Sequence, residues 1–319
     1  VAAMTRGDVA VRPPVKVVWP EPEIMKPADA ASSPPEKIWY FHGLPLYKGN
    51  YPAFYDVSDM PGTKILQDNY EALRTEILDF YENHRSKLPE QNVPYAYTDP
   101  GWLAMTLYAF GFKHRERCAD LPVLDSVVRQ IPNAVCVTVS VLKPHTRIHA
   151  HTGSTSAVVR THVPIYIPGA YPACGIRVGG YGRGWDDGEI FGLEMARRHY
   201  AWNNTDEARI ALIVDTIKDE YAANGENIAA RCVALLGMQK VSSRFPFTKK
   251  FPRPLLDFIH WGGGLTVQAM LKYQRLRGDT WLRVKHPPKP TPAAAPPLND
   301  AKGDLRARLG QTREACLSW

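Results

Sequence analysis

The feature that most constrains the fold of this chain is a run of short alternating apolar segments between residues 134 and 217. The segments are AVCVTVSVL, AVVRTHVPIYI, CGIRVGG, GEIFGLE and ARIALIVDTI, with Gly, Pro, Asn or Asp between them. A period of two is typical of strands with one buried face, and regularly spaced turn residues favour antiparallel connections. The sequence therefore predicts an antiparallel sandwich or jelly roll.

Helical patterns flank this β-rich region. Apolar residues at helical spacing predict an amphipathic helix over 64–84, namely Leu66, Tyr70, Leu73, Ile77 and Tyr81. A β-rich stretch, PGWLAMTLYAFG, follows, then a short predicted helix over 124–131 that ends at Pro132. The pattern turns helical again after Asp219. The expected fold class is mainly β with flanking helices around a jelly-roll core.

Composition divides the chain into four predicted parts. Residues 1–36 are rich in Pro, Ala and Ser, and residues 286–319 begin HPPKPTPAAAPPLND, so we expect a disordered arm and a disordered tail. The β-rich domain is expected over 37–225. A basic, aromatic helical extension is expected over 226–285.

The net charge of +7 is concentrated near the C-terminus. Between residues 240 and 285 there are ten Lys or Arg residues and two Asp residues. The five cysteines are scattered without a CxxC pair, which favours a reducing compartment over a disulfide framework. No apolar run has the length of a signal peptide or of a transmembrane helix. We expect a cytoplasmic protein.

The stretch from Ser140 to His162, SVLKPHTRIHAHTGSTSAVVRTH, has the strongest chemical character. Three histidines follow the first strand, and Arg160 and His162 lie in the next one. Imidazoles at a strand end, followed by cations on a neighbouring strand, suggest a metal with an anionic co-ligand. A polar hairpin with solvated histidines is the alternative interpretation of this stretch alone.

Residues further along the chain favour the metal. Arg160 and His162 share one face of their predicted strand because they are two residues apart, and Ser140 on the neighbouring strand can join them. His199 begins a late strand and Arg209 lies in the last one. Two histidines with a trailing arginine suit Fe(II) and 2-oxoglutarate, because iron needs imidazole ligands with open positions and a guanidinium binds a carboxylate in bidentate fashion.

Three segments in order resemble the aspartyl/asparaginyl β-hydroxylase family of 2-oxoglutarate oxygenases. They are VSVLKPHTRIHAHTGSTSAVVRTHVPIYIP, IRVGGYGRGWDDGEIFGLE and RRHYAWNNTDEARIALIVD. The HTG turn, the R-x-H pair, the W-x-x-G motif and the R-I-x-x-I-V-D motif agree jointly. The resemblance extends from about Trp102 to Asp215 and implies a double-stranded β-helix, cupin-like core.

The resemblance also implies roles for individual residues. Iron would be bound by His151 and His199. The expected 2-oxoglutarate contacts are Ser140, Arg160, His162 and Arg209, with Trp102 as a wall of the same pocket. The implied cofactors are Fe(II), 2-oxoglutarate as co-substrate and O₂. His145 and His149 are interpreted as loop histidines.

Three positions depart from the wider pattern. Most 2-oxoglutarate oxygenases have a carboxylate ligand two residues after the first histidine, where this chain has Gly153. The β-hydroxylases proper also have glycine there, with water as the third ligand, whereas relatives that hydroxylate lipid A acyl chains tend to have an acid. Gly153 therefore favours the β-hydroxylases, although a vacant position also allows halogenating relatives to bind chloride. The family's substrate-facing arginine is replaced by Val158. Its Asp-Asp pair before the second histidine is Glu194-Met195, which puts the partner of an iron-bound water in question.

The resulting hypothesis is a 2-oxoglutarate-dependent dioxygenase that hydroxylates the β-carbon of an Asp/Asn-type residue, amino acid or peptide-derived metabolite. One alternative is a lipid acyl hydroxylase that contacts the membrane periphery through 240–285. The same segment is somewhat better interpreted as a basic helical cap packed on the barrel. A halogenase and a non-enzymatic cupin-like binding module are further alternatives. No nucleic-acid partner is expected, because the basic stretch matches no recognised module.

Overall fold

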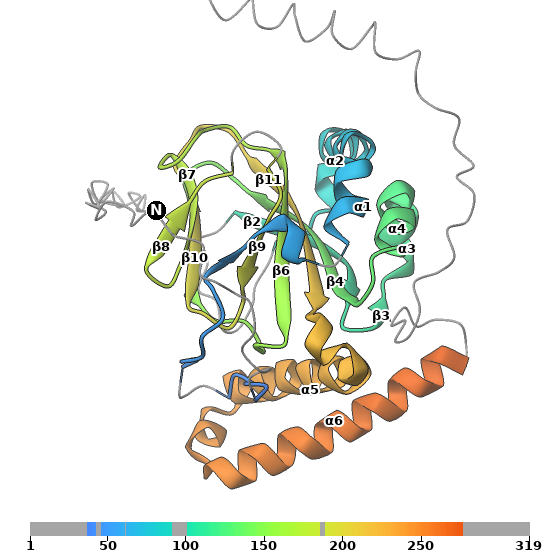
Figure 1. Ribbon diagram of the computed structural model, residues 1–319, viewed down its shortest axis with the longest axis vertical. Coiled ribbons are helices and arrows are strands. Elements are labelled where there is room, and N and C mark those ends of the chain that lie inside the picture. Colours follow the sequence, from blue (N-terminus) through green and yellow to red (C-terminus); the bar gives the residue numbers. More distant parts are fainter. Residues whose placement is uncertain (1–36, 43–45, 61, 91–100, 186–188, 277–319) are drawn as a thin grey trace, which may run out of the picture. The chain divides into compact units, whose positions relative to one another are not determined.

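The computed structural model describes residues 37–42, 46–60, 62–90, 101–185 and 189–276, and two antiparallel sheets dominate it (Figure 1). The larger sheet has the order β1-β9-β6-β11-β4-β2-β3 and the smaller one the order β5-β10-β7-β8. The larger sheet comprises β1 (Phe54–Tyr55), β2 (Trp102–Ala109), β3 (Phe112–Lys113), β4 (Ala134–Leu142), β6 (Val158–Tyr166), β9 (Phe191–Glu194) and β11 (Arg209–Ile217). The smaller sheet comprises β5 (Thr146–His151), β7 (Cys174–Val178), β8 (Tyr181–Arg183) and β10 (His199–Asn203).

The chain crosses repeatedly between the two sheets from β4 onward. β4, β6, β9 and β11 belong to the larger sheet, while β5, β7, β8 and β10 lie between them in sequence and belong to the smaller one. Two sheets wound together in this alternating order form a double-stranded β-helix. The predicted fold class, mainly β with a jelly-roll core and flanking helices, is confirmed.

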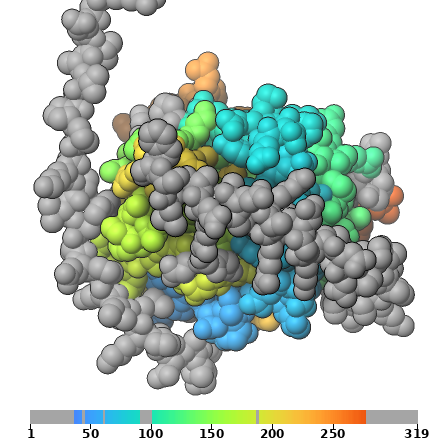
Figure 2. All heavy atoms as spheres, turned by 90° about the horizontal axis from the view of Figure 1, so that it is seen from above, coloured from blue at the N-terminus to red at the C-terminus, as the bar shows by residue number. Residues whose placement is uncertain are grey.

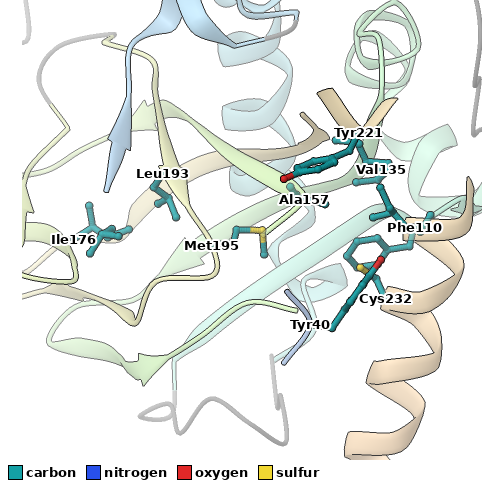
Figure 3. Close-up of a cluster of buried hydrophobic side chains, with 14 of the residues drawn as sticks. Tyr40, Phe110, Val135, Ala157, Ile176, Leu193, Met195, Tyr221 and Cys232 are labelled. Carbon is teal, nitrogen blue, oxygen red and sulfur yellow. The ribbon is translucent and has the colours of Figure 1, made fainter. Parts of the chain in front are cut away.

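The two faces of β11 show how the alternating pattern organises the interior. Ile210, Leu212 and Val214 belong to the apolar cluster that the larger sheet shares with the N-terminal helices. Arg209 and Asp215 alternate with them and therefore lie on the opposite face. A second apolar cluster joins residues of both sheets to the C-terminal helices, and Figure 3 shows it around Leu193, Met195 and Tyr221, for example.

Four helices pack on the outer face of the larger sheet: α1 (Thr63–Asp68), α2 (Tyr70–His84), α3 (Arg115–Asp120) and α4 (Pro122–Val128). The cyan atoms of α2 lie on the face seen in Figure 2. The prediction of one helix over 64–84 is wrong, because Asn69 interrupts it with φ −111° and ψ 10°. The Asn69 amide donates to the Ile65 carbonyl at 2.8 Å, a bond that competes with continuation of the helix.

The histidine-containing segment after β4 is a strand in its own right. The sequence analysis places these histidines between predicted strands, whereas the structure pairs β5 with β10. The segment has only two apolar side chains, Ile148 and Ala150, so its alternation is too weak a signal to predict a strand. Short helical turns connect several elements: η1 (Val57–Asp59), η2 (Arg85–Lys87), η3 (Asp219–Asn224) and η4 (Pro246–Lys250).

Two long helices follow the β-domain, where the sequence predicts a helical extension. α5 (Gly225–Arg244) contributes Ile228, Ala229 and Cys232 to the cluster between the sheets. α6 (Arg253–Leu276) contacts α5 through Val267 and Leu271. Within the described ranges, no helix is both long and apolar enough to cross a bilayer. The predicted disordered segments, 1–36 and 286–319, lie outside the described residues.

Candidate active site

His151 and His199 meet at the edge between two strands of the smaller sheet. His151 ends β5 and His199 begins β10, and their Cα atoms are direct cross-strand partners. Their ring centroids are 4.3 Å apart. The Nδ1 atom of His151 lies 2.8 Å from the carbonyl of His149, and the Nδ1 atom of His199 lies 2.8 Å from the carbonyl of Arg197. Since a carbonyl only accepts, each Nδ1 carries the proton and each Nε2 keeps its lone pair.

The burial of both rings keeps them neutral. Burial, with a smaller contribution from the Arg160 guanidinium, lowers the pKa of His151 to about 4 against the opposing effect of the bond to the His149 carbonyl. Burial and the neighbouring His151 ring hold the pKa of His199 well below its ordinary value. Neutral imidazoles with Nε2 lone pairs are the form in which histidine ligates a metal.

The two imidazoles offer nitrogen donors of the kind that a divalent iron binds. The Nε2 atom of His199 is buried and has no hydrogen-bond partner in the described part of the chain, which is costly unless a ligand satisfies it. Among the described residues, no group of three or more His, Cys, Asp or Glu side chains could hold a metal. The residues therefore fit an iron with two protein ligands, the remaining positions being left to co-substrate, water and O₂.

Gly153 lies two residues beyond His151 and is closed in by Met195. A Cβ atom at Gly153 would approach the Met195 Cβ to 2.7 Å, its Cε to 2.8 Å and its carbonyl oxygen to 3.0 Å. The Gly153 amide also donates to the Met195 carbonyl at 2.7 Å. A carboxylate at position 153 has no room here, so the absence of a third protein ligand is built into the packing.

Arg209 is a buried cation on the facing sheet. The whole residue is 1% exposed, and its Nε and Nη1 atoms have no hydrogen-bond partner among the described residues. Its guanidinium lies 4.7 Å from the centroid of the Trp185 ring. Ser140 pairs with Ala211 across β4 and β11, which makes Ser140 a diagonal neighbour of Arg209 on one face. A buried guanidinium with unused donors fits a carboxylate.

Trp102 and Ser140 lie together on the same face as Arg209. The indole Nε1 of Trp102 donates to the Ser140 Oγ at 3.0 Å. This bond occupies an acceptor position of the hydroxyl and leaves its hydrogen to be donated elsewhere. Trp102 therefore orients Ser140 as a donor beside Arg209.

His162 and Arg160 lie on β6 facing the same interior. The His162 ring stacks on Phe191 with centroids 5.4 Å apart and an interplanar angle of 10°, and its buried Nδ1 has no partner among the described residues. Arg160 makes a bidentate ion pair with Asp215, with Nε–Oδ1 at 2.7 Å and Nη2–Oδ2 at 2.9 Å. Arg160 thus has a strong protein partner in addition to the co-substrate that the sequence predicts for it.

The electrostatics of this interior favour an anion. Burial is the largest cause that holds the pKa of His162 well below its usual range, followed by the nearby cations Arg209, Arg160 and Arg183. Glu194, the acid nearest in sequence to His199, accepts from Lys218 Nζ at 2.7 Å and from Tyr55 at 2.6 Å. Its carboxylate is thus bound within a buried ion pair rather than free to neutralise the cations.

All seven predicted site residues lie on the facing sides of the two sheets or at their edge. The sequence analysis missed Asp215 and gave no role to Trp185. A period of two counted from Arg209 through 211 and 213 would have placed Asp215 on the same face. Trp185 belongs to the quoted W-x-x-G motif. His145 and His149 are exposed, and His145 forms an ion pair with Asp206 at 2.9 Å, as loop histidines commonly do.

The central part of the chain is similar to known proteins. Residues 67–219 match the family model described as Aspartyl/Asparaginyl beta-hydroxylase. The chain is 29% identical over 172 residues to the ornithine lipid ester-linked acyl 2-hydroxylase of Rhizobium tropici, covering 52% of this chain and 61% of that protein. It is 25% identical over 158 residues to the human aspartyl/asparaginyl beta-hydroxylase, covering 48% of this chain and 20% of that protein.

Solved structures with the same kind of core are more distant. A prolyl-4-hydroxylase from Pseudomonas putida is 11% identical with a TM-score of 0.34, covering 52% of this chain and 92% of that one. A Cupin 2 conserved barrel domain protein from Salinispora arenicola is 14% identical with a TM-score of 0.27, covering 43% of this chain and 87% of that one. The fold assignment rests on the strand order of this chain.

The strand order defines a cupin-like fold, and the family match indicates a hydroxylase. Residues 67–219 match the aspartyl/asparaginyl β-hydroxylase family model, and the similar named relatives are hydroxylases. The predicted family resemblance is confirmed. The chain spans about three fifths of the rhizobial relative and a fifth of the human one.

Proposed function

We propose that this protein is an Fe(II)- and 2-oxoglutarate-dependent dioxygenase that hydroxylates an unactivated C–H bond. The observation that carries the proposal is the combination of two neutral histidines, His151 and His199, with the buried guanidinium of Arg209. The two histidines suit a metal, and the guanidinium suits a dicarboxylate. The histidines and Arg209 lie on facing sheets of one barrel. Iron and 2-oxoglutarate remain proposals, supported by this donor set and by the family.

Each residue has a defined task in this proposal. His151 and His199 hold iron through Nε2, with their orientation fixed by the carbonyls that accept from Nδ1. Arg209 and Ser140 bind the distal carboxylate of 2-oxoglutarate, and Trp102 orients the hydroxyl. Arg160 and His162 hold the chelating end. His162 reaches it as a neutral ring, because burial and the surrounding cations oppose its protonation.

When bound, iron would enable O₂ to oxidise the substrate C–H bond, while 2-oxoglutarate is converted to succinate and CO₂. One oxygen atom enters the substrate as a hydroxyl and the other enters succinate. The protein contributes positioning and exclusion of water by apolar walls. Trp185 and Phe191 are 3% and 1% exposed and shield the cation side of the site.

Two positions that are polar in the family bear on the substrate that we propose. The first predicted substrate class, the β-carbon of an Asp/Asn-type residue or metabolite, would need a cation where Val158 lies. Val158 is buried within the apolar cluster between the sheets, and Met195 lies where an acid is expected. Both replacements are apolar, and the rhizobial relative is named for a lipid acyl chain. These two apolar replacements favour the acyl chain over the Asp/Asn-type substrate.

The test is mass spectrometry of candidate substrates incubated with the protein, Fe(II) and 2-oxoglutarate, with and without chloride. A product heavier by one oxygen atom supports hydroxylation, whereas a chlorinated product would show that the vacant third ligand position serves a halogenase. Lipid extracts and Asp- or Asn-containing peptides form separate arms. Absence of succinate in every arm would leave only the non-enzymatic binding module.

The metal assignment has its own control within the chain. His151→Ala and His199→Ala are expected to lose both succinate production and the visible absorption of Co(II) bound in place of iron. His149→Ala is the matched control, because its side chain is exposed and the substitution keeps the backbone carbonyl that accepts from His151. Retention of Co(II) absorption in either ligand variant would contradict the assignment.

A further inference from the structure

Helix α6 carries two apolar stripes on opposite faces. Its buried residues are His260, Gly264, Val267 and Leu271, and this face lies toward α5 and the segment around Tyr40 and His42. The opposite face repeats at intervals of three and four residues: Leu255, Phe258, Gly262, Leu265, Ala269, Tyr273 and Leu276. Figure 1 shows α5 between α6 and the strands, so this second stripe has no neighbouring element among the described ones.

The exposure of this region is concentrated rather than scattered. Thirteen large hydrophobic side chains are exposed in the described part of the chain, and all but Leu46 and Val123 lie between residues 241 and 276. Phe258 is 65% exposed and Trp261 54%, and their ring centroids are 6.1 Å apart. A contiguous exposed apolar surface on a soluble protein marks an interaction site.

Cations border the apolar stripe. Between residues 240 and 276 one acid, Asp257, stands against seven cations: Lys240, Arg244, Lys249, Lys250, Arg253, Lys272 and Arg275. Asp257 is already paired with Arg253 at 3.3 Å and lies 3.0 Å from His42. The surface is therefore apolar along its centre and positive at its margins.

We propose that this surface, formed by η4 and the exposed stripe of α6, docks on an anionic lipid bilayer. An amphipathic helix with aromatic and aliphatic side chains on one face and Lys or Arg beside them lies in the plane of the interface, with the cations at the headgroups. The 24 residues of α6 give it a length of about 36 Å along the membrane. A second copy is a poorer occupant, because pairing two such faces would place the same cations against one another.

The proposed membrane contact rests on the proposed function only in the choice of substrate. An enzyme bound to a bilayer has direct access to the acyl chains of the lipids in it. The face of α6 that packs on α5 and the face that we propose for lipid contact are opposite sides of one helix. Packing of this segment against the domain is therefore compatible with the proposed membrane contact.

The experiment is co-sedimentation of the full chain with vesicles of phosphatidylcholine, with and without phosphatidylglycerol, at low and high salt. We expect binding to the anionic vesicles that salt weakens. Lys249→Gln with Lys250→Gln removes two cations and is expected to weaken partitioning about fivefold for each. Phe258→Gln with Leu265→Gln is expected to weaken it at least about tenfold. Val123→Gln is the control, an exposed apolar side chain outside the surface.

Absence of binding to anionic vesicles, or equal binding by both double variants and the wild type, would overturn the proposal. Loss of binding by Val123→Gln to the same extent would overturn it as well. Light scattering that shows a wild-type dimer and a monomeric Phe258/Leu265 variant would assign the surface to a second copy instead. Thermal melts establish that each variant is folded. The vesicle arm requires neither iron nor 2-oxoglutarate, so its failure is separable from failure of the proposed chemistry.

Discussion

A methyl group added at Gly153 is the sharpest probe of the site's packing. The Cβ atom of Gly153→Ala would lie 2.7 Å from the Cβ and 2.8 Å from the Cε of Met195. The Met195 Cε belongs to a flexible side chain and can move, but its Cβ and its carbonyl oxygen at 3.0 Å are fixed by the backbone. Gly153 cannot retreat either, because its amide donates to that same carbonyl at 2.7 Å.

The cost of this clash follows from overpacking in a close-packed interior. Inserting a methylene-sized group where no space exists destabilises a protein by about 1–3 kcal/mol. We expect the upper half of that range here, because two of the three contacts are with atoms that cannot rotate away. Each kcal/mol lowers the melting temperature by about 2–4 °C for a domain of this size. Gly153→Asp is expected to lose at least as much stability and to gain no metal affinity.

Urea denaturation followed by circular dichroism measures this difference directly. The matched control is Gly237→Ala in α5, where an added Cβ meets nothing within 4 Å. Because alanine has the higher helix propensity, Gly237→Ala is expected to raise the free energy of unfolding by about 0.5–1 kcal/mol. A Gly153→Ala protein as stable as the wild type would refute the reasoning. Tighter Co(II) binding by Gly153→Asp would show that the position accommodates a third ligand after all.

Three further expectations concern other buried groups. Glu194→Gln leaves Lys218 buried without its carboxylate and is expected to lower the free energy of unfolding by about 3–5 kcal/mol. Glu194→Gln with Lys218→Met should lower it less. Equal losses in urea titrations of the two variants would argue against a coupled ion pair. Arg209→Lys removes the guanidinium fork that would bind a carboxylate. The 2-oxoglutarate concentration that gives half-maximal succinate production is expected to rise about tenfold or more. An unchanged concentration would place the co-substrate elsewhere. Burial lowers the pKa of His260 to about 4, so the unfolded chain binds the extra proton between about pH 6.5 and 4 and stability falls as pH decreases through that window. Melting temperatures at pH 7 and pH 5 should differ less for His260→Gln than for the wild type.

The sequence predicts the elements whose signals are local. The alternation in β4, β6 and β11 identifies strands with one apolar face, and the helical spacing of Leu73 and Ile77 identifies α2. The shared face of Arg160 and His162 follows from a period of two. These predictions depend only on neighbours a few residues away.

Features that depend on register between distant segments could not be predicted. The Arg160–Asp215 ion pair exists because those two residues are direct partners across β6 and β11. The closure of Gly153 by Met195 likewise requires the turn before β10 to lie against the turn after β5. Asn69 could have been expected to interrupt the first helix, but only its side-chain bond to the Ile65 carbonyl explains why it does.

Residues that precede the family-matched region also contact the elements that carry the site. The folded domain therefore begins before that region. Strand β1 pairs with β9 through Phe54 and Leu193. Arg197, whose carbonyl accepts from the ring of His199, itself donates to the Tyr51 carbonyl at 2.8 Å and the Gly49 carbonyl at 3.2 Å. A fragment that begins at residue 67 would keep every recognisable motif. It would lose the Tyr51 and Gly49 carbonyls that hold Arg197 next to His199. The unit of sequence similarity is thus shorter than the unit that must fold together.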